Sequence, residues 1–244
     1  MNATSNNAVL LSPHIDDVAL SLGGALLDGR FPSATVVNVF STSRSAYDDN
    51  DVERVTATRR REDRSFFQKM QWPMRSIYLD RLDAPLRLEI SDDEVCSVSS
   101  PASDAHEVVH ILKAIEPLRA PHALLIAPLG LGRHVDHVLV HRAACDSTTM
   151  GWRLAFYEDA PYANDLTFEE IQLTANAASK ELGGSLSPLL LPFDQAGLDK
   201  VAAITVYRSQ LGPTSVARVH SHSMRFGDPA ERLWILEPSS FQSA

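Results

Sequence analysis

Two short segments of the sequence concentrate histidine and aspartate. The first, SPHIDD (12–17), follows an apolar run and offers an imidazole from His14 and two adjacent carboxylates, Asp16 and Asp17. One aspartate at the start of a helix usually only caps it. Because one cap needs one acceptor, a second carboxylate with a histidine nearby points to metal binding or catalysis.

The second segment, GRHVDHVLVHRAA (132–144), also follows an apolar run. His134, Asp136 and His137 lie at a predicted loop-to-helix junction, and His141 lies one helical turn further on. Imidazole and carboxylate ligands suit zinc, and catalytic zinc sites use three protein ligands and an open position. The two segments together therefore predict a zinc site. His137 and His141 also have the i,i+4 spacing of a helical ligand pair, so the residue types alone leave the ligand set open.

The elements that must position these residues alternate between short aliphatic runs and longer helical patterns. Strands are predicted at 8–12, 34–40, 76–79 and 122–127, with possible additions at 153–159 and 187–193. Helices are predicted at 18–27, 52–70 and 105–118, with a late helix at 198–211. This alternation indicates an α/β fold of Rossmann-like type, with a mostly parallel sheet and helices on both faces. We expect one domain spanning residues 1–244.

Both histidine–aspartate segments follow predicted strands. Ligands of open α/β sheets bind beyond the carboxyl ends of the strands. We therefore expect the two segments to meet at one edge of the sheet.

The composition narrows the class of protein. With 44% apolar and 22% charged residues in 244, the chain has the balance of a globular protein. A net charge of −9 disfavours nucleic acid as a partner. No apolar run approaches the roughly 18 residues of a membrane span. Cys96 and Cys145 have no zinc-binding spacing, and we expect a cytoplasmic protein with reduced thiols. The arginine-rich stretch 54–64 is interpreted as a solvated helix face.

The motifs resemble those of the PIG-L/LmbE-type zinc-dependent N-deacetylases, in which PHIDD corresponds to the first family motif and HVDH to the second. Further similar segments are RRRED (59–63), YEDAPYA (157–163) and VYRSQL (206–211). Ile15 and Val18 depart from the usual Pro and Glu of the first motif, which leaves the ligands in place but puts the pocket's shape in doubt.

The resemblance implies a role for each polar residue. It makes His14, Asp17 and His137 the ligands of Zn²⁺ or another divalent metal. It makes Asp16 the general base and His134 the acid or oxyanion donor, with Asp136 orienting His134. Arg59 becomes a substrate contact.

The expected function is zinc-dependent removal of an N-acyl group, in the first place N-acetyl, from an amino-sugar conjugate or a natural-product amine. The partner would be this small-molecule substrate, and a homo-oligomer is possible. Specificity would lie in the loop 91–104 and the segment 157–190. The alternatives are an amidase for thiol conjugates and an inactive small-molecule-binding member, although Asp16 and His134 are both present. A dehydrogenase is disfavoured because SLGGALLDG lacks the G-x-G-x-x-G spacing.

The remaining histidines leave one question open. His220 and His222 either line the pocket or lie in a surface loop. His106, His110 and His122 are interpreted as structural.

Overall fold

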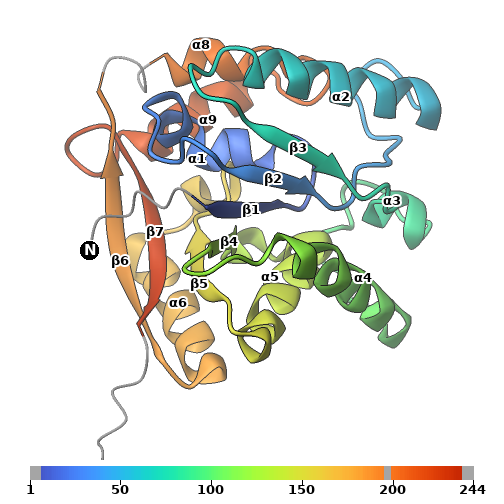
Figure 1. Cartoon of the computed structure of the whole chain (residues 1–244). Coiled ribbons are helices and arrows are strands. Elements are labelled where there is room, and N and C mark those ends of the chain that lie inside the picture. Colours follow the sequence, from blue (N-terminus) through green and yellow to red (C-terminus); the bar gives the residue numbers. More distant parts are fainter. Residues whose placement is uncertain (1–6, 195–198, 238–244) are drawn as a thin grey trace, which may run out of the picture.

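The aliphatic runs form one sheet in the computed structural model, which describes residues 7–194 and 199–237 (Figure 1). Its seven strands are β1 (Ala8–Ser12), β2 (Thr35–Asn38), β3 (Arg75–Tyr78), β4 (Leu124–Pro128), β5 (Arg153–Tyr157), β6 (Ser185–Pro192) and β7 (Ala230–Glu237). Their spatial order is β3-β2-β1-β4-β5-β7-β6. Strands β1 to β5 are parallel, and β7 pairs antiparallel with both β5 and β6.

The order of the strands places a switch point between β1 and β4. From β1 the chain builds outward through β2 to β3, and it then returns to the opposite side of β1 with β4. Leu10 of β1 consequently faces Val36 of β2 on one side and Ile126 of β4 on the other. Ligands of open α/β sheets bind where the strand order reverses. Both histidine–aspartate segments follow the strands at this point.

Helices cover both faces of the sheet, which confirms the expected fold class. They are α1 (Asp17–Leu27), α2 (Val52–Phe67), α3 (Ala84–Arg87), α4 (Ala105–Ile115), α5 (Val135–Asp146), α6 (Phe168–Leu182), α8 (Lys200–Ile204) and α9 (Pro213–Ser223). Single 3₁₀ turns lie at Ala102–Asp104, Glu116–Leu118, Leu131–Arg133, Ser147–Met150 and Tyr162–Asp165. Helices α4, α5 and α6 lie on one side, and α1, α8 and α9 on the other (Figure 1). Within the described ranges, no helix has the length and apolar character needed to cross a bilayer.

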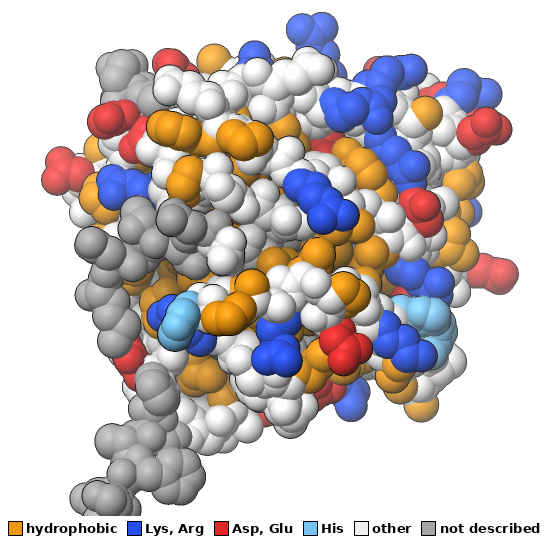
Figure 2. All heavy atoms as spheres, viewed as in Figure 1, with side chains coloured by type: hydrophobic (Ala, Val, Ile, Leu, Met, Phe, Trp, Pro, Cys, Tyr) orange, Lys and Arg blue, Asp and Glu red, His pale blue; other side chains and the backbone are white. Residues whose placement is uncertain are grey.

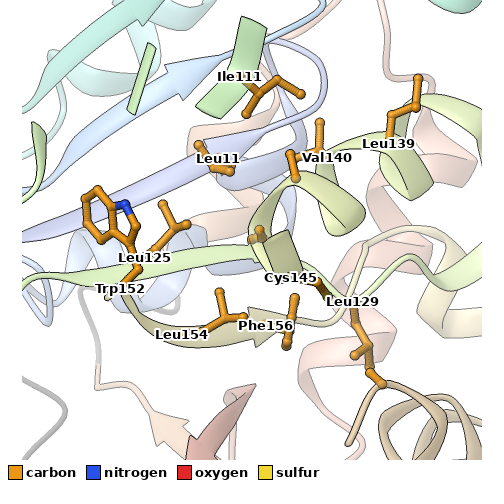
Figure 3. Packing of buried hydrophobic residues seen from close by; sticks show 14 of the residues in the cluster. Leu11, Ile111, Leu125, Leu129, Leu139, Val140, Cys145, Trp152, Leu154 and Phe156 are labelled. Carbon is orange, nitrogen blue, oxygen red and sulfur yellow. The ribbon is translucent and has the colours of Figure 1, made fainter. Parts of the chain in front are cut away.

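Each face has its own apolar core. On one face, Leu11 and Leu125 of the sheet pack in a cluster with Ile111 of α4 and Val140 of α5 (Figure 3). On the other face, a second cluster joins the alternate side chains of β1 and β4 to α1 and α8. This alternation follows from the strand geometry, in which successive side chains point to opposite faces. The two cores hold the strand ends, and therefore the site, in fixed positions.

Helix α2 carries the arginine-rich stretch as expected. Its N-cap Asp51 accepts a hydrogen bond from the backbone N–H of Arg54, and the helix then runs to Phe67. Most of its arginines lie on the outer side, and Figure 2 shows Lys and Arg side chains gathering over the edge where Figure 1 places α2. Arg59 is the buried exception, with 4% of its surface exposed. The solvated-face interpretation therefore holds for the stretch but not for Arg59.

The C-terminal third differs from the sequence prediction. The helix expected at 198–211 ends at Ile204 in the structure, and residue 198 lies outside the described residues. The chain leaves the helix because Tyr207 is fully buried and its hydroxyl donates to Asp63 of α2 at 3.2 Å. Helices α6 and α9 and strand β7 were not predicted.

Candidate active site

The turn after β1 places the side chains of the two adjacent aspartates, Asp16 and Asp17, in different surroundings. The Ser12 hydroxyl accepts a hydrogen bond from the backbone N–H of Val18 at 3.2 Å and so serves the start of α1. Asp16 occupies the N-cap position, yet its side chain makes no capping hydrogen bond. The Asp17 carboxylate accepts from the backbone N–H of His14 at 2.7 Å. The Asp16 side chain therefore does not cap α1, and its carboxylate lines the cleft described below.

Three side chains from the two motifs gather around one point. Asp17 Oδ2 lies 3.1 Å from His14 Nδ1 and 3.3 Å from His137 Nε2. The ligand atoms of these three residues all lie within 4.8 Å of one another. His137 Nε2 is buried and, among the described residues, has no hydrogen-bond partner. A divalent cation would satisfy this nitrogen, and two imidazoles with one carboxylate match a catalytic zinc site.

The charges around this point attract a cation. Burial alone would lower the pKa of His14, but its contacts with Asp136 and Asp17 outweigh burial and raise the pKa to about 9. Burial would raise the pKa of Asp17, but His137 and His14 hold it well below its usual value. The buried carboxylates therefore stabilise positive charge here, whether it is carried by protons or by a metal.

A second group of possible ligands, His14, His134 and Asp136, also lies close together. Its carboxylate is already engaged, because Asp136 Oδ1 accepts from Arg87 at 2.7 Å and Oδ2 from the backbone N–H of Ala84 at 2.8 Å. His134 Nδ1 accepts from the backbone N–H of Asp136 at 3.1 Å. The group of His14, Asp17 and His137 is therefore the better candidate.

The contacts of Asp136 correct the sequence analysis. Its carboxylate was expected to orient His134, but it lies 3.0 Å from His14 Nε2 instead, and only its backbone N–H reaches His134. Burial, with the charges of His14 and His137, lowers the pKa of His134 to about 2. Since Nδ1 of this neutral ring accepts a hydrogen bond, its proton is on Nε2.

A cleft of about 230 Å³ opens onto these groups. Its lining includes Asp16 and His134, so both expected catalytic residues face one space. Arg59 also lines it, and its guanidinium donates to Asp16 Oδ1 at 3.1 Å and to Ser43 Oγ at 3.0 Å. Asp92 and Val95 of the loop 91–104 and Tyr162 of the segment 157–190 also line it, from the two regions where specificity was expected. Ser45 and Asp83 are lining residues that the sequence analysis missed.

Comparisons with known proteins identify the family and the reaction class. Residues 9–147 match the family model described as PIG-L, GlcNAc-PI de-N-acetylase. The chain belongs to the PIG-L family. A relative from Streptomyces fradiae, 2'-N-acetylparomamine deacetylase, is 33% identical over 238 residues, which cover 93% of this chain and 80% of the relative. The expected family and the reaction class, N-deacetylation, are thereby confirmed.

Solved structures confirm the fold of this PIG-L chain. A zinc-inhibited form of teicoplanin deacetylase is similar with a TM-score of 0.69 and 19% identity, covering 96% of this chain and 99% of the other. N,N'-diacetylchitobiose deacetylase from Pyrococcus horikoshii is similar with a TM-score of 0.60 and 15% identity, covering 96% of this chain and 84% of the other.

Two PIG-L-like segments that are distant in sequence meet beside the cleft. Glu62 of RRRED accepts hydrogen bonds from the backbone N–H and the hydroxyl of Ser209, at 2.9 and 2.6 Å. The next residue of VYRSQL, Gln210, lines the cleft and donates to the backbone carbonyl of Ser45 at 2.7 Å. Asp63 accepts from Tyr207. The contacts between these two segments therefore stabilise the part of the cleft lining that contains Arg59.

The YEDAPYA segment supplies another part of the cleft's lining, which includes Tyr162. The Tyr162 ring lies edge-on to His137, with centroids 5.4 Å apart. It also covers Gly132, where an added Cβ would lie only 2.5 Å from Tyr162 Cγ. Gly132 has φ of 74°, so both its backbone and its lack of a side chain are required here.

The other histidines lie apart from the candidate metal site. His141 Nδ1 faces the carbonyl of Pro128 at 3.0 Å, so this ring does not form a ligand pair with His137. His222 is buried against Glu158, with Nε2 3.0 Å from the carboxylate, and His220 is exposed. Neither His220 nor His222 is among the cleft's lining residues.

Proposed function

We propose that this PIG-L chain is a zinc-dependent hydrolase that removes the N-acetyl group from an amino-sugar natural product. The observation that carries the proposal is the placement of the candidate ligands His14, Asp17 and His137 beside a cleft that Asp16 and His134 also line. Metal, base and hydrogen-bond donor would thus act on one substrate. The presence of both Asp16 and His134 argues against an inactive binding protein.

The side chains of the cleft divide the chemistry between them. His14, Asp17 and His137 would hold a divalent ion, which would supply Lewis acidity for the amide carbonyl and lower the pKa of water. Asp16 accepts the proton of the attacking water, and Arg59 holds the Asp16 carboxylate through its hydrogen bond. His134 donates a hydrogen bond from Nε2 to the developing oxyanion, and Asp16 passes the proton taken from water to the departing nitrogen. Water is consumed, and acetate and the free amine are the products.

Two observations support the substrate class. The relative's name indicates an N-acetylated amino sugar as that protein's substrate. The cleft of this chain is lined by Asp83 and Asp92 in addition to Asp16 and Asp17. Carboxylates on the cleft wall can pair with the ammonium groups of a polyamino sugar. We therefore favour an N-acetylated aminoglycoside precursor over a thiol conjugate.

The test is amine and acetate release from a panel of 2'-N-acetylparomamine, a neutral N-acetylglucosamine conjugate and an N-acylated thiol conjugate. We expect release from the first compound, loss of activity with a strong chelator, and recovery with zinc. Turnover that survives complete metal removal would overturn the metal-dependent mechanism. Hydrolysis of the thiol conjugate alone would overturn the substrate class.

A further inference from the structure

Asp159 connects His137 to the turn that follows β4. It comes two residues after the end of β5 and is fully buried. One carboxylate oxygen, Oδ1, lies 2.7 Å from His137 Nδ1. The other, Oδ2, accepts hydrogen bonds from the backbone N–H groups of Gly130 at 3.0 Å and Leu131 at 3.1 Å. The Asp159 side chain thus contacts both the His137 ring and the backbone of the turn after β4.

These contacts determine which nitrogen of His137 is available to a metal. A neutral imidazole has one N–H donor and one acceptor nitrogen. With Asp159 accepting at Nδ1, a ring proton is placed there, and Nε2 is the nitrogen directed toward Asp17. The buried, unpartnered Nε2 described above is therefore the nitrogen that is ready to bind a metal.

We propose that Asp159 is a positioning residue that fixes the tautomer and ring orientation of His137 for metal binding. The inference rests on the proposed metal-dependent function and adds a residue outside the candidate ligand set. Carboxylates that accept from the second nitrogen of a histidine ligand stabilise that ligand in metal sites. Asp159 also holds the turn that leads into His134 and α5, so the same side chain aligns both histidines of HVDH.

An asparagine at this position would favour the wrong tautomer. The two backbone N–H groups of Gly130 and Leu131 require an acceptor, which only the amide oxygen of asparagine can provide. Its NH₂ group would then face His137 Nδ1. Nδ1 would become an acceptor, the ring proton would move to Nε2, and that nitrogen could no longer bind a metal.

The experiment compares Asp159→Asn with the matched control Glu158→Gln. Glu158 is the neighbouring buried carboxylate on the same segment, but it accepts from Arg232 and from Trp234 Nε1 rather than contacting His137. Zinc affinity is measured by competition with a chromogenic chelator, and thermal unfolding reports folding. We expect Asp159→Asn to bind zinc about 10–100-fold more weakly and Glu158→Gln to bind it as the wild type does.

Nitrogen-15 NMR of the His137 ring gives a second readout that also works in the wild type. In the zinc-loaded wild type, Nδ1 should carry the proton and Nε2 should be metal-bound, whereas metal-free Asp159→Asn should carry its proton on Nε2. Zinc bound through Nδ1 in the wild type, unchanged affinity in Asp159→Asn, or an equal loss in Glu158→Gln would each overturn the positioning role. A wild type that binds no zinc would instead overturn the proposed function itself.

Discussion

Asp16 and Asp17 are neighbours with the same side chain, yet the structure gives them different surroundings. The Asp17 carboxylate is held by the backbone N–H of His14 and faces two imidazoles, whereas the Asp16 carboxylate contacts Arg59 and lines the cleft. We predict that Asp16→Asn keeps the metal and lowers kcat by about 10²- to 10⁴-fold, because an amide cannot take the proton from water. Zinc content and single-substrate kinetics test this. Loss of the metal from this variant would mean that the two aspartates have exchanged roles.

His137 and His141 lie one turn apart on α5, and their surroundings differ just as clearly. His137 points into the candidate metal site, whereas His141 faces the carbonyl of Pro128 and packs on Phe156. We predict that His137→Ala purifies without zinc and that His141→Ala retains it, because removing one of three ligands leaves too few. Metal analysis of both folded variants provides the measurement. Equal loss from both would show that the helix supplies two ligands.

At the scale of elements, Asp63 connects α2 to β3 and to the segment that follows α8. It accepts hydrogen bonds from Tyr78 at 2.6 Å and Tyr207 at 3.2 Å, and burial raises its pKa to about 7. The folded chain therefore keeps a proton that the unfolded chain releases near pH 4, and stability is lost as the pH rises from about 4 to about 7. Between about pH 5 and pH 8 the loss is on the order of 3 kcal/mol.

Asp63→Asn should remove this loss, since an amide does not titrate and its oxygen still accepts from a tyrosine hydroxyl. Urea unfolding of both proteins at the two pH values tests the prediction. Other titrating groups affect both proteins alike, so the difference between them isolates Asp63. An identical pH dependence would show that the carboxyl is ionised in the folded chain.

The elements also show what the sequence could predict. Strands β1 and β4 and the polar turns after them were predicted because local patterns determine both: a short aliphatic run and a cluster of ligand residues. The contacts of Asp136 could not be predicted, because Arg87 and Ala84 come from a segment some 50 positions away that has no periodic pattern. The end of α8 likewise depends on the buried contact of Tyr207 with α2, which the helical pattern of 198–211 does not contain.

At the scale of the whole molecule, parallel strands bring the site together from distant parts of the chain. The carboxyl ends of β1, β4 and β5 supply His14, His137 and Asp159, and the segments after β2 and β3 supply Ser45 and Asp83. Each of the five parallel strands is thus followed by polar residues at the same edge. Substrate specificity can therefore change in one connecting segment while the candidate metal ligands stay in place.

The charge of the molecule leads to a last prediction about its substrate. The chain has a net charge of −9, and Asp83 and Asp92 line the cleft. A negative field focused by a cleft raises the rate of encounter with cations, and salt screens it with a Debye length of about 10 Å at 0.1 M. The kcat/KM for 2'-N-acetylparomamine should therefore fall severalfold between about 20 mM and about 300 mM salt. A neutral N-acetylglucosamine conjugate should show little change.

Asp92→Asn tests whether the cleft itself contributes to this effect. Asp92 is exposed at the cleft, where its carboxylate accepts from the Ser45 hydroxyl at 2.6 Å, and the neighbouring Asp93 is exposed but is not a lining residue. We expect Asp92→Asn to raise KM for the cationic substrate and to flatten its salt dependence while kcat stays near wild type, because the contact is made equally in the ground state and the transition state. Asp93→Asn should match the wild type. Salt profiles that are the same for cationic and neutral substrates would contradict electrostatic recognition, and equal effects of the two variants would assign it to the overall charge rather than to the cleft.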